Sequence, residues 1–110
     1  MARGGFPMGG GNMQQLMRQA QKMQADMQKK QAELNAATFT AQAGGGMVTV
    51  TVYGTKEVKS IEIKPEVVDP DDVEMLQDLI LAGVNAAIKE ASEAVEREMG
   101  KLTGGMNLGF

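Results

Sequence analysis

The sequence contains no histidine, no cysteine and no tryptophan among its 110 residues. Without histidine the chain lacks the side chain that most often acts as general acid or base, and the commonest metal ligand, near neutral pH. Without cysteine it has no thiol nucleophile, no disulfide and no thiolate metal site. We therefore expect a protein that is not an enzyme and that needs no metal or other cofactor.

Long apolar runs are absent as well. No stretch approaches the roughly 20 residues that a membrane-spanning helix needs, and the N-terminal residues carry a charge without the apolar run of a signal peptide. We expect a cytoplasmic protein with no membrane partner and no small-molecule substrate. A chain of this length suits one domain with a modest core, which a partner surface would help to stabilise.

The net charge of -3 argues against nucleic acid, but the charge is unevenly distributed. Residues 1–34 hold five basic and two acidic residues, whereas residues 65–110 hold three basic and ten acidic ones. A basic front and an acidic back are typical of a surface for polyanions. The alternative is that the acids only solvate one helix, and charge alone does not decide between the two.

The first predicted helix follows a Gly-rich segment, residues 1–11, that we expect to be a flexible arm. Asn12 is a suitable N-cap, and residues 13–34 contain neither Gly nor Pro. Their apolar residues repeat every seven positions, as in a helix that lies along another helix. One column is formed by Met13, Ala20, Met27 and Leu34, and the other by Leu16 and Met23, with Lys30 interrupting it.

Three strands are predicted between residues 38 and 63. The first covers residues 38–43, Gly44-Gly45-Gly46 forms a hairpin turn, and the second alternates Val with Thr or Tyr from Met47 to Tyr53. After a turn at residues 54–56, the third strand covers residues 58–63, with a bulge near Lys59 and Ser60 because its apolar positions change phase. The strands form an antiparallel meander with one face to cover.

A second long helix is predicted from Pro70 to Met99, with Asp69 as N-cap and Gly100 as its stop. Its apolar arc spans about 200°, wider than one packed face requires. We expect it to cover the sheet with one side and to meet another helix with the other. The pattern as a whole predicts an α+β fold in a single domain, residues 12–100, followed by a flexible Gly/Met tail, residues 101–110.

Two sets of side chains are candidate binding residues. Arg18, Lys22 and Lys29 lie within about 40° of one another on the face of the first helix opposite the apolar columns, so they could meet DNA phosphates. The equally open alternative is a solvated face of a helical arm. The apolar seams predict a homodimer, since a monomer would expose them. The expected interface residues are Met13, Leu16, Met23, Met27, Leu81, Ile88 and Val95.

Other motifs fit structural roles better than chemistry. The triple glycine precedes a strand and lacks a following Lys-Ser/Thr, so it does not match a phosphate-binding loop. The acids between Asp69 and Asp78 lack the spacing and the glycine of a calcium loop, and we assign them to capping and solvation. No catalytic constellation is evident.

The order of elements and several local strings resemble the YbaB/EbfC nucleoid-associated protein family, over nearly the whole chain. The strings are AGGGMVTV at residues 43–50, Gly54, DPDD at residues 69–72, LQDLI at residues 76–80, Ala82, and NA at residues 85–86. The resemblance implies an α-β-β-β-α subunit and a bacterial homodimer with projecting helical arms. It also implies binding of double-stranded DNA in the nucleoid, changes in DNA conformation, nucleoid organisation and an effect on gene regulation. The cations of the first helix, which can meet phosphates without reading bases, predict that this binding is weakly selective for sequence.

The resemblance does not identify the residues that touch DNA. Gly83 stands where this family usually has Ala, which predicts slightly looser packing of the second helix. The alternative function is a coiled-coil adaptor or a holdase whose Met-rich arms grip proteins. Retardation of DNA by the purified protein would separate the two functions.

Overall fold

The computed structural model describes the backbone of residues 8–102 and the side chains of residues 12–102. The elements follow in the order helix α1 (Met8–Ala36), strands β1 (Thr38–Ala43), β2 (Val48–Tyr53) and β3 (Val58–Ile63), the short 3-10 helix η2 (Pro65–Val67), and helix α2 (Val73–Leu102). The expected α-β-β-β-α architecture is therefore confirmed. Residues 1–7 of the expected arm and residues 103–110 of the expected tail lie outside the described residues.

The sheet is an antiparallel meander in the order β1-β2-β3. Gly44, Gly45 and Gly46 all adopt positive φ in the hairpin between β1 and β2, as the turn requires. Thr51 pairs with Ser60 and Val52 pairs with Val58, which leaves Lys59 without a partner on β2. The bulge expected near Lys59 and Ser60 is thus confirmed.

The core lies between α2 and one face of the sheet. Val48, Val50 and Val52 on β2 are fully buried, and they pack against Ala87 and Ala91 of α2. Burying each valine contributes about 1.5–3 kcal/mol relative to leaving it exposed. The strict alternation of β2 puts these valines on one face, so the sequence pattern alone specifies which side α2 covers.

Gly83 lets α2 approach the sheet closely. An added Cβ there would lie 2.9 Å from Cγ2 of Val50, and Gly83 itself is buried. Val50 is fully buried and has a stiff β-branched side chain, so it has little room to move away. The expectation that glycine loosens the packing here is wrong, because the missing methyl group is what allows the contact.

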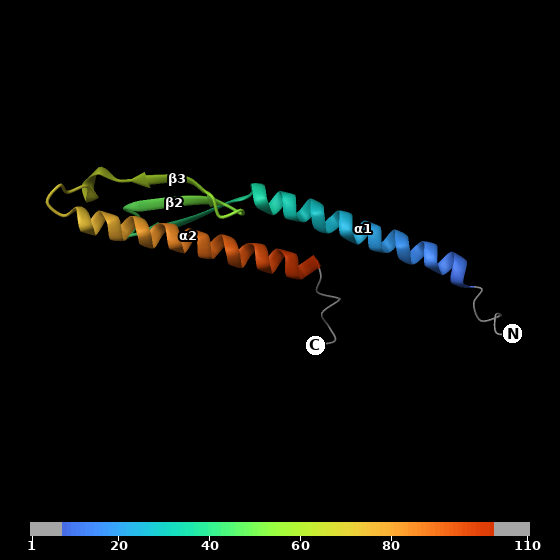
Figure 1. Ribbon diagram of the computed structural model, residues 1–110. Coiled ribbons are helices and arrows are strands. Elements are labelled where there is room, and N and C mark those ends of the chain that lie inside the picture. The colour runs from blue at the N-terminus through green and yellow to red at the C-terminus, as the bar shows by residue number, and fades with distance from the viewer. Residues whose placement is uncertain (1–7, 103–110) are drawn as a thin grey trace.

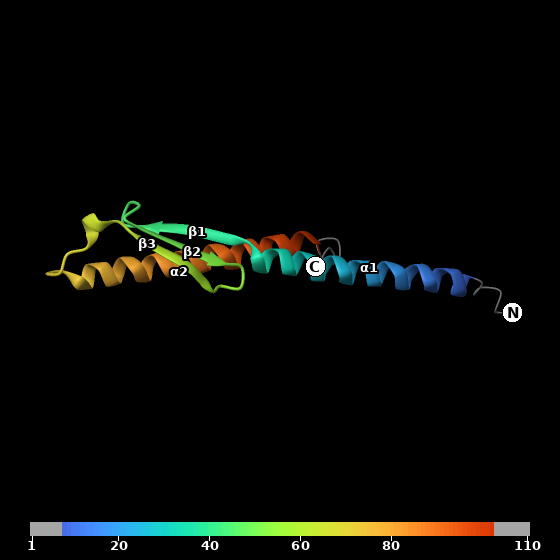
Figure 2. The same cartoon turned by 90° about the horizontal axis from the view of Figure 1, so that it is seen from above.

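Helix α1 projects from the body as an arm. Figures 1 and 2 show it running away from the end of the sheet and past the C-terminal end of α2. Leu34, near its body end, is buried, whereas residues 12–26 are all exposed. The subunit is correspondingly elongated, with extents of 87 × 26 × 16 Å.

The ends of α1 and of α2 differ from those expected. Helix α1 begins at Met8 rather than after Asn12, so it includes the glycines at positions 9–11. Glycine costs about 1 kcal/mol per residue in a helix relative to alanine, but lengthening an existing helix needs no new nucleus. At the other end of the chain, α2 passes through Gly100 and ends at Leu102. Lys101 donates a hydrogen bond to Glu98 at 3.0 Å within that last turn.

The N-terminus of α2 is capped by Asp72 rather than by Asp69. The Oδ1 atom of Asp72 accepts a hydrogen bond from the backbone N–H of Met75 at 3.2 Å. Asp69 instead closes the preceding turn, because its Oδ1 accepts from the N–H of Asp71 at 2.9 Å. Two aspartates in DPDD can each cap a backbone N–H, and sequence spacing alone did not tell which one starts the helix.

Candidate nucleic-acid interface

The three cations expected to meet DNA all lie on α1. Arg18, Lys22 and Lys29 are each exposed. From Arg18 to Lys29 the helix rises by 11 residue steps, or about 16 Å. Helix α1 is long and contains no proline, so it holds these side chains at fixed positions along one rod. Because α1 projects from the body, there is room for a bulky polyanion beside it.

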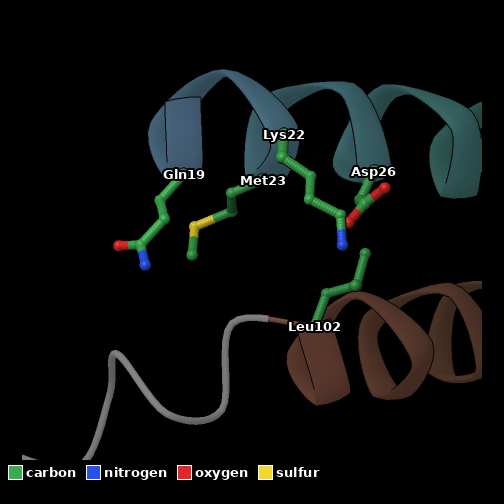
Figure 3. Close-up of a pocket in the computed structure, with 5 residues that line it drawn as sticks. All are labelled: Gln19, Lys22, Met23, Asp26 and Leu102. Atoms are coloured by element: carbon green, nitrogen blue, oxygen red, sulfur yellow. The ribbon is translucent and has the colours of Figure 1, made fainter. Parts of the chain in front are cut away.

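Lys22 differs from the other two cations because it also borders a cleft. The cleft, of about 310 Å³, lies between α1 and the last turn of α2. Figure 3 shows Lys22 and Met23 of α1 pointing toward Leu102 of α2, with Gln19 and Asp26 beside them. Helical periodicity relates the three cations to one another but does not orient α1 on the body, so this position of Lys22 could not be foreseen.

An ion-pair network links the arm to the body. Glu98 of α2 contacts Lys30 Nζ of α1 at 3.3 Å and Lys101 Nζ at 3.0 Å. The hydrogen bonds from Lys101 and Lys30 hold the pKa of the Glu98 carboxyl below its usual value. Lys30 is the residue that interrupts an apolar column of α1, and that interruption was the sequence signal for a contact with an acidic partner.

Two of the acids around the start of α2, Asp69 and Asp72, cap backbone N–H groups. Within residues 8–102, no three acidic side chains gather closely enough to hold a metal ion. Among the sheet cations, Lys59 at the bulge lies with its Nζ 6.0 Å from the centroid of the Tyr53 ring. Tyr53 ends β2 beside Gly54, so this contact lies on the body near the base of the arm.

The expected interface residues fall into two groups. Met13, Leu16, Met23 and Leu81 are exposed, and Leu81 leaves 59% of its surface accessible. Met27, Ile88 and Val95 are half-buried, and Ile88 packs against the valines and alanines of its own core. Ile88 therefore stabilises the core of its own subunit and is only partly available for a dimer interface.

An apolar strip on β3 was missed by the sequence analysis. Val58, Ile61 and Ile63 pair with the core valines of β2, so they share the face on which α2 lies. Helix α2 packs over β1 and β2, however, and leaves these three side chains 37–41% exposed. Val68, Val73 and Met75 just beyond β3 are also exposed. The alternation along the strands indicates which face of the sheet these residues occupy, but it does not indicate how far α2 extends across that face.

Among the described residues, no helix combines the length and the apolar character that a membrane span needs. Charged residues recur along both long helices, among them the cations of α1 and the ion pair between Lys30 and Glu98.

Comparisons with known proteins agree on one family. The model of the YbaB/EbfC DNA-binding family matches residues 8–106. A nucleoid-associated protein of Clostridium novyi is 64% identical over 110 residues, covering 98% of this chain and 96% of the relative. A nucleoid-associated protein of Acetivibrio thermocellus is 61% identical over 106 residues, covering 96% and 94%. Among solved structures, an uncharacterized Helicobacter pylori protein matches with a TM-score of 0.60 and 25% identity, over 84% of this chain and 94% of that one.

Proposed function

This chain belongs to the YbaB/EbfC DNA-binding family, and we propose that it binds duplex DNA in the nucleoid through the cations of the arm α1. The proposal depends mainly on the geometry of α1. This helix projects from the body over most of its length, and its Arg18, Lys22 and Lys29 side chains are exposed. Cations on such a rod supply affinity from phosphates without reading bases. The protein therefore binds with little sequence selectivity, and we infer that it alters DNA conformation and contributes to nucleoid organisation.

A homodimer would double these cations, and the exposed apolar surface supports one. Soluble monomers rarely leave a large contiguous apolar patch in water. The β3 strip (Val58, Ile61 and Ile63) and the exposed Leu81 are apolar surfaces that a second copy would cover. We propose that the bodies of the two subunits contact each other through these residues and through the outer flanks of Ile88 and Val95.

The arms form the second part of the proposed dimer. The partner would contact the apolar column of α1 at the exposed Met13 and Leu16 and at the outer flanks of Met23 and Met27, of which Met23 also borders the cleft to α2 of its own subunit. The cations lie on another side of α1, roughly 155° around the helix from the mean direction of these four apolar residues, so a partner there leaves the cations free for phosphates. The same methionines would suit an adaptor or a holdase, but the family to which the chain belongs favours DNA.

Replacing Leu81 with Asp should dissociate the dimer without unfolding the subunit. Leu81 is 59% exposed in the single subunit, so the fold loses little. In the seam, the lost apolar burial and the unpaired charge cost about 3 kcal/mol per copy. Both copies carry the change, which weakens dimerisation by about 10⁴-fold. Sedimentation equilibrium should report monomers, and circular dichroism an intact fold.

The control is Ala82→Asp, which adds the same charge to an exposed position next along the helix but about 100° around it. This variant should stay dimeric. Ile88→Asp is a poorer probe, because Ile88 packs into its own core and its loss would unfold the subunit. A Leu81→Asp variant that sediments as wild type would remove Leu81 from the interface.

The function itself is tested by gel retardation of two unrelated duplexes at several salt concentrations. Six cations in a dimer, each neutralising one phosphate, give a slope of about -5 in log K against log salt. Equal retardation of both duplexes, lost steeply with salt, is the expected result. Strong preference for one sequence, or retardation that salt does not affect, would contradict phosphate binding by the arm.

A further inference from the structure

The arm carries its charges on one side only. All six charged residues of α1 fall within about 120° of the helix circumference, at about 100° per residue. The opposite side is uncharged and rich in exposed glutamines that lie within about 80° of one another. These are Gln14, Gln21, Gln24 and Gln28, which we call the amide side. Each amide can donate and accept hydrogen bonds, so this side is built for polar contacts that involve no charge.

The amide side points away from the body of its own subunit. The side of α1 that faces α2 is marked by Gln19, Met23 and Asp26, which line the cleft with Leu102 (Figure 3). The mean direction of the amide side lies roughly 180° around the helix from these three residues. The arm cations lie between the two sides, about 95° from the amide side. A ligand that contacts the amide side therefore meets neither α2 nor the sheet, but it has the cations beside it.

The projecting part of α1 has the dimensions of a helix that fits the major groove of duplex DNA. Residues 12–26 are all exposed, which corresponds to about 22 Å of helix. A helix with its side chains is about 10–12 Å across, and the major groove is about 12 Å wide. Because the body lies on the opposite side, the amide side reaches the floor of the groove while α2 stays outside the duplex. The cations, about a quarter of a turn away, then face the phosphates of one strand.

We propose that α1 lies in the major groove with its amide side on the base edges, and that its glutamines bind adenine best. The inference rests on the proposed function, because it needs the arm cations on the phosphates. Contacts to phosphates position a protein on the duplex but carry no sequence information. The amide side adds a second kind of contact, hydrogen bonds to bases, whose strength does not depend on the release of counterions.

Glutamine suits the adenine edge because its amide carries a donor and an acceptor side by side. Its N–H donates to N7 of adenine, and its carbonyl oxygen accepts from the N6 amino group. The same amide also donates to the acceptor atoms of guanine and thymine, and it accepts from the N4 amino group of cytosine. Because some hydrogen bond forms at every base pair, the preference for adenine is only a few-fold. Such a preference is compatible with the weak sequence selectivity proposed above.

The first test changes the DNA and leaves the protein intact. A 7-deazaadenine base has C–H in place of N7, which removes the major-groove acceptor but keeps the base pairing and the charge of the duplex. We expect a duplex that carries this base to bind about threefold to tenfold more weakly at fixed salt, with the salt slope still about -5. The control is 3-deazaadenine, which changes only the minor-groove acceptor N3 and should bind as unmodified DNA. Weakening by 3-deazaadenine alone would place the contact in the minor groove and overturn the proposal.

The second test removes amides from the protein without changing its charge. The double change Gln21→Ala, Gln24→Ala acts at two exposed positions, and alanine is the better helix former, so the arm stays helical. Its affinity for duplex DNA should fall about tenfold, its salt slope should stay at about -5, and its response to 7-deazaadenine should disappear. The matched control is Gln15→Ala, Gln19→Ala, two exposed glutamines of the same helix on the half that faces α2. This control should bind as wild type and should still respond to 7-deazaadenine.

Failure of base contact and failure of the function give different results. If Gln21→Ala, Gln24→Ala binds as wild type, or if 7-deazaadenine has no effect on the wild type, the amide side is only solvated and the inference is wrong. An equal loss in the two pairs of variants would overturn it as well. In each of these cases, retardation with a salt slope of about -5 would still support phosphate binding by the arm. A wild-type protein that retards no duplex would remove the function itself.

Discussion

The triple change Arg18→Glu, Lys22→Glu, Lys29→Glu is expected to abolish retardation of unrelated duplexes. It replaces six cations of a dimer by six anions on the surface that we propose to meet phosphates. Loss of six phosphate contacts and the added repulsion weaken binding by on the order of 100-fold or more at moderate salt. All three positions are exposed, so the fold and the dimer should survive, which sedimentation and circular dichroism would verify.

A variant with the same change of charge on the sheet provides the comparison. Lys56→Glu, Lys59→Glu, Lys64→Glu alters the net charge equally but leaves the arm intact. If the arm binds DNA, this sheet variant keeps most of its affinity, and the arm variant loses it. Equal loss in both would mean that net charge alone governs binding. Loss in the sheet variant alone would move the interface from α1 to the body, and the arm cations would be only a solvated face.

Much of the sheet could be predicted because β2 alternates with a strict period of two and β3 departs from that period at one point. Val48, Val50 and Val52 alternate with polar residues, and they are the three largest fully buried side chains. The bulge at Lys59 followed from a change of phase in β3. These features depend on local periodicity, which a single sequence displays directly.

The helix ends were less predictable because several residues compete for the same role. Asp69 and Asp72 can both cap a free N–H, and the glycines at positions 9–11 and 100 can either end a helix or continue it. The choice depends on small differences of about 1 kcal/mol per residue, which neighbouring contacts easily reverse. In α2 the hydrogen bond from Lys101 to Glu98 lies in the turn that continues past Gly100.

The candidate site shows a different limit of sequence reasoning. Periodicity places Arg18, Lys22 and Lys29 together on α1, but the orientation of α1 on the body depends on long-range contacts. The contacts that involve Leu34, Lys30 and Gly54 bring Lys22 to the cleft beside Leu102. The β3 strip was missed for the same reason, because the crossing of α2 over β1 and β2 is a property of packing and not of alternation.

Gly54 is the position where one added methyl group should have the largest effect on stability. The sequence suggests only a turn, but in the structure Gly54 is buried beneath the last turn of α1. A Cβ on Gly54 would overlap the backbone carbonyl oxygen of Leu34 and lie 3.3 Å from Cα of Asn35. The Gly54 N–H also donates to the carbonyl of Ala37 at 3.0 Å. The glycine thus lets the base of the arm rest directly on the end of β2.

We therefore expect Gly54→Ala to destabilise the fold by about 3 kcal/mol or more, because the obstacle is backbone that cannot change rotamer. For a domain of this size the melting midpoint should fall by about 12 °C or more, measured by circular dichroism. Gly100→Ala is the matched control, since nothing lies within 4 Å of a Cβ there and the residue is helical. That variant should be as stable as wild type or up to about 1 kcal/mol more stable. If Gly54→Ala melts with the wild type, then α1 does not rest on β2 as closely as described, and the direction of the arm is set elsewhere.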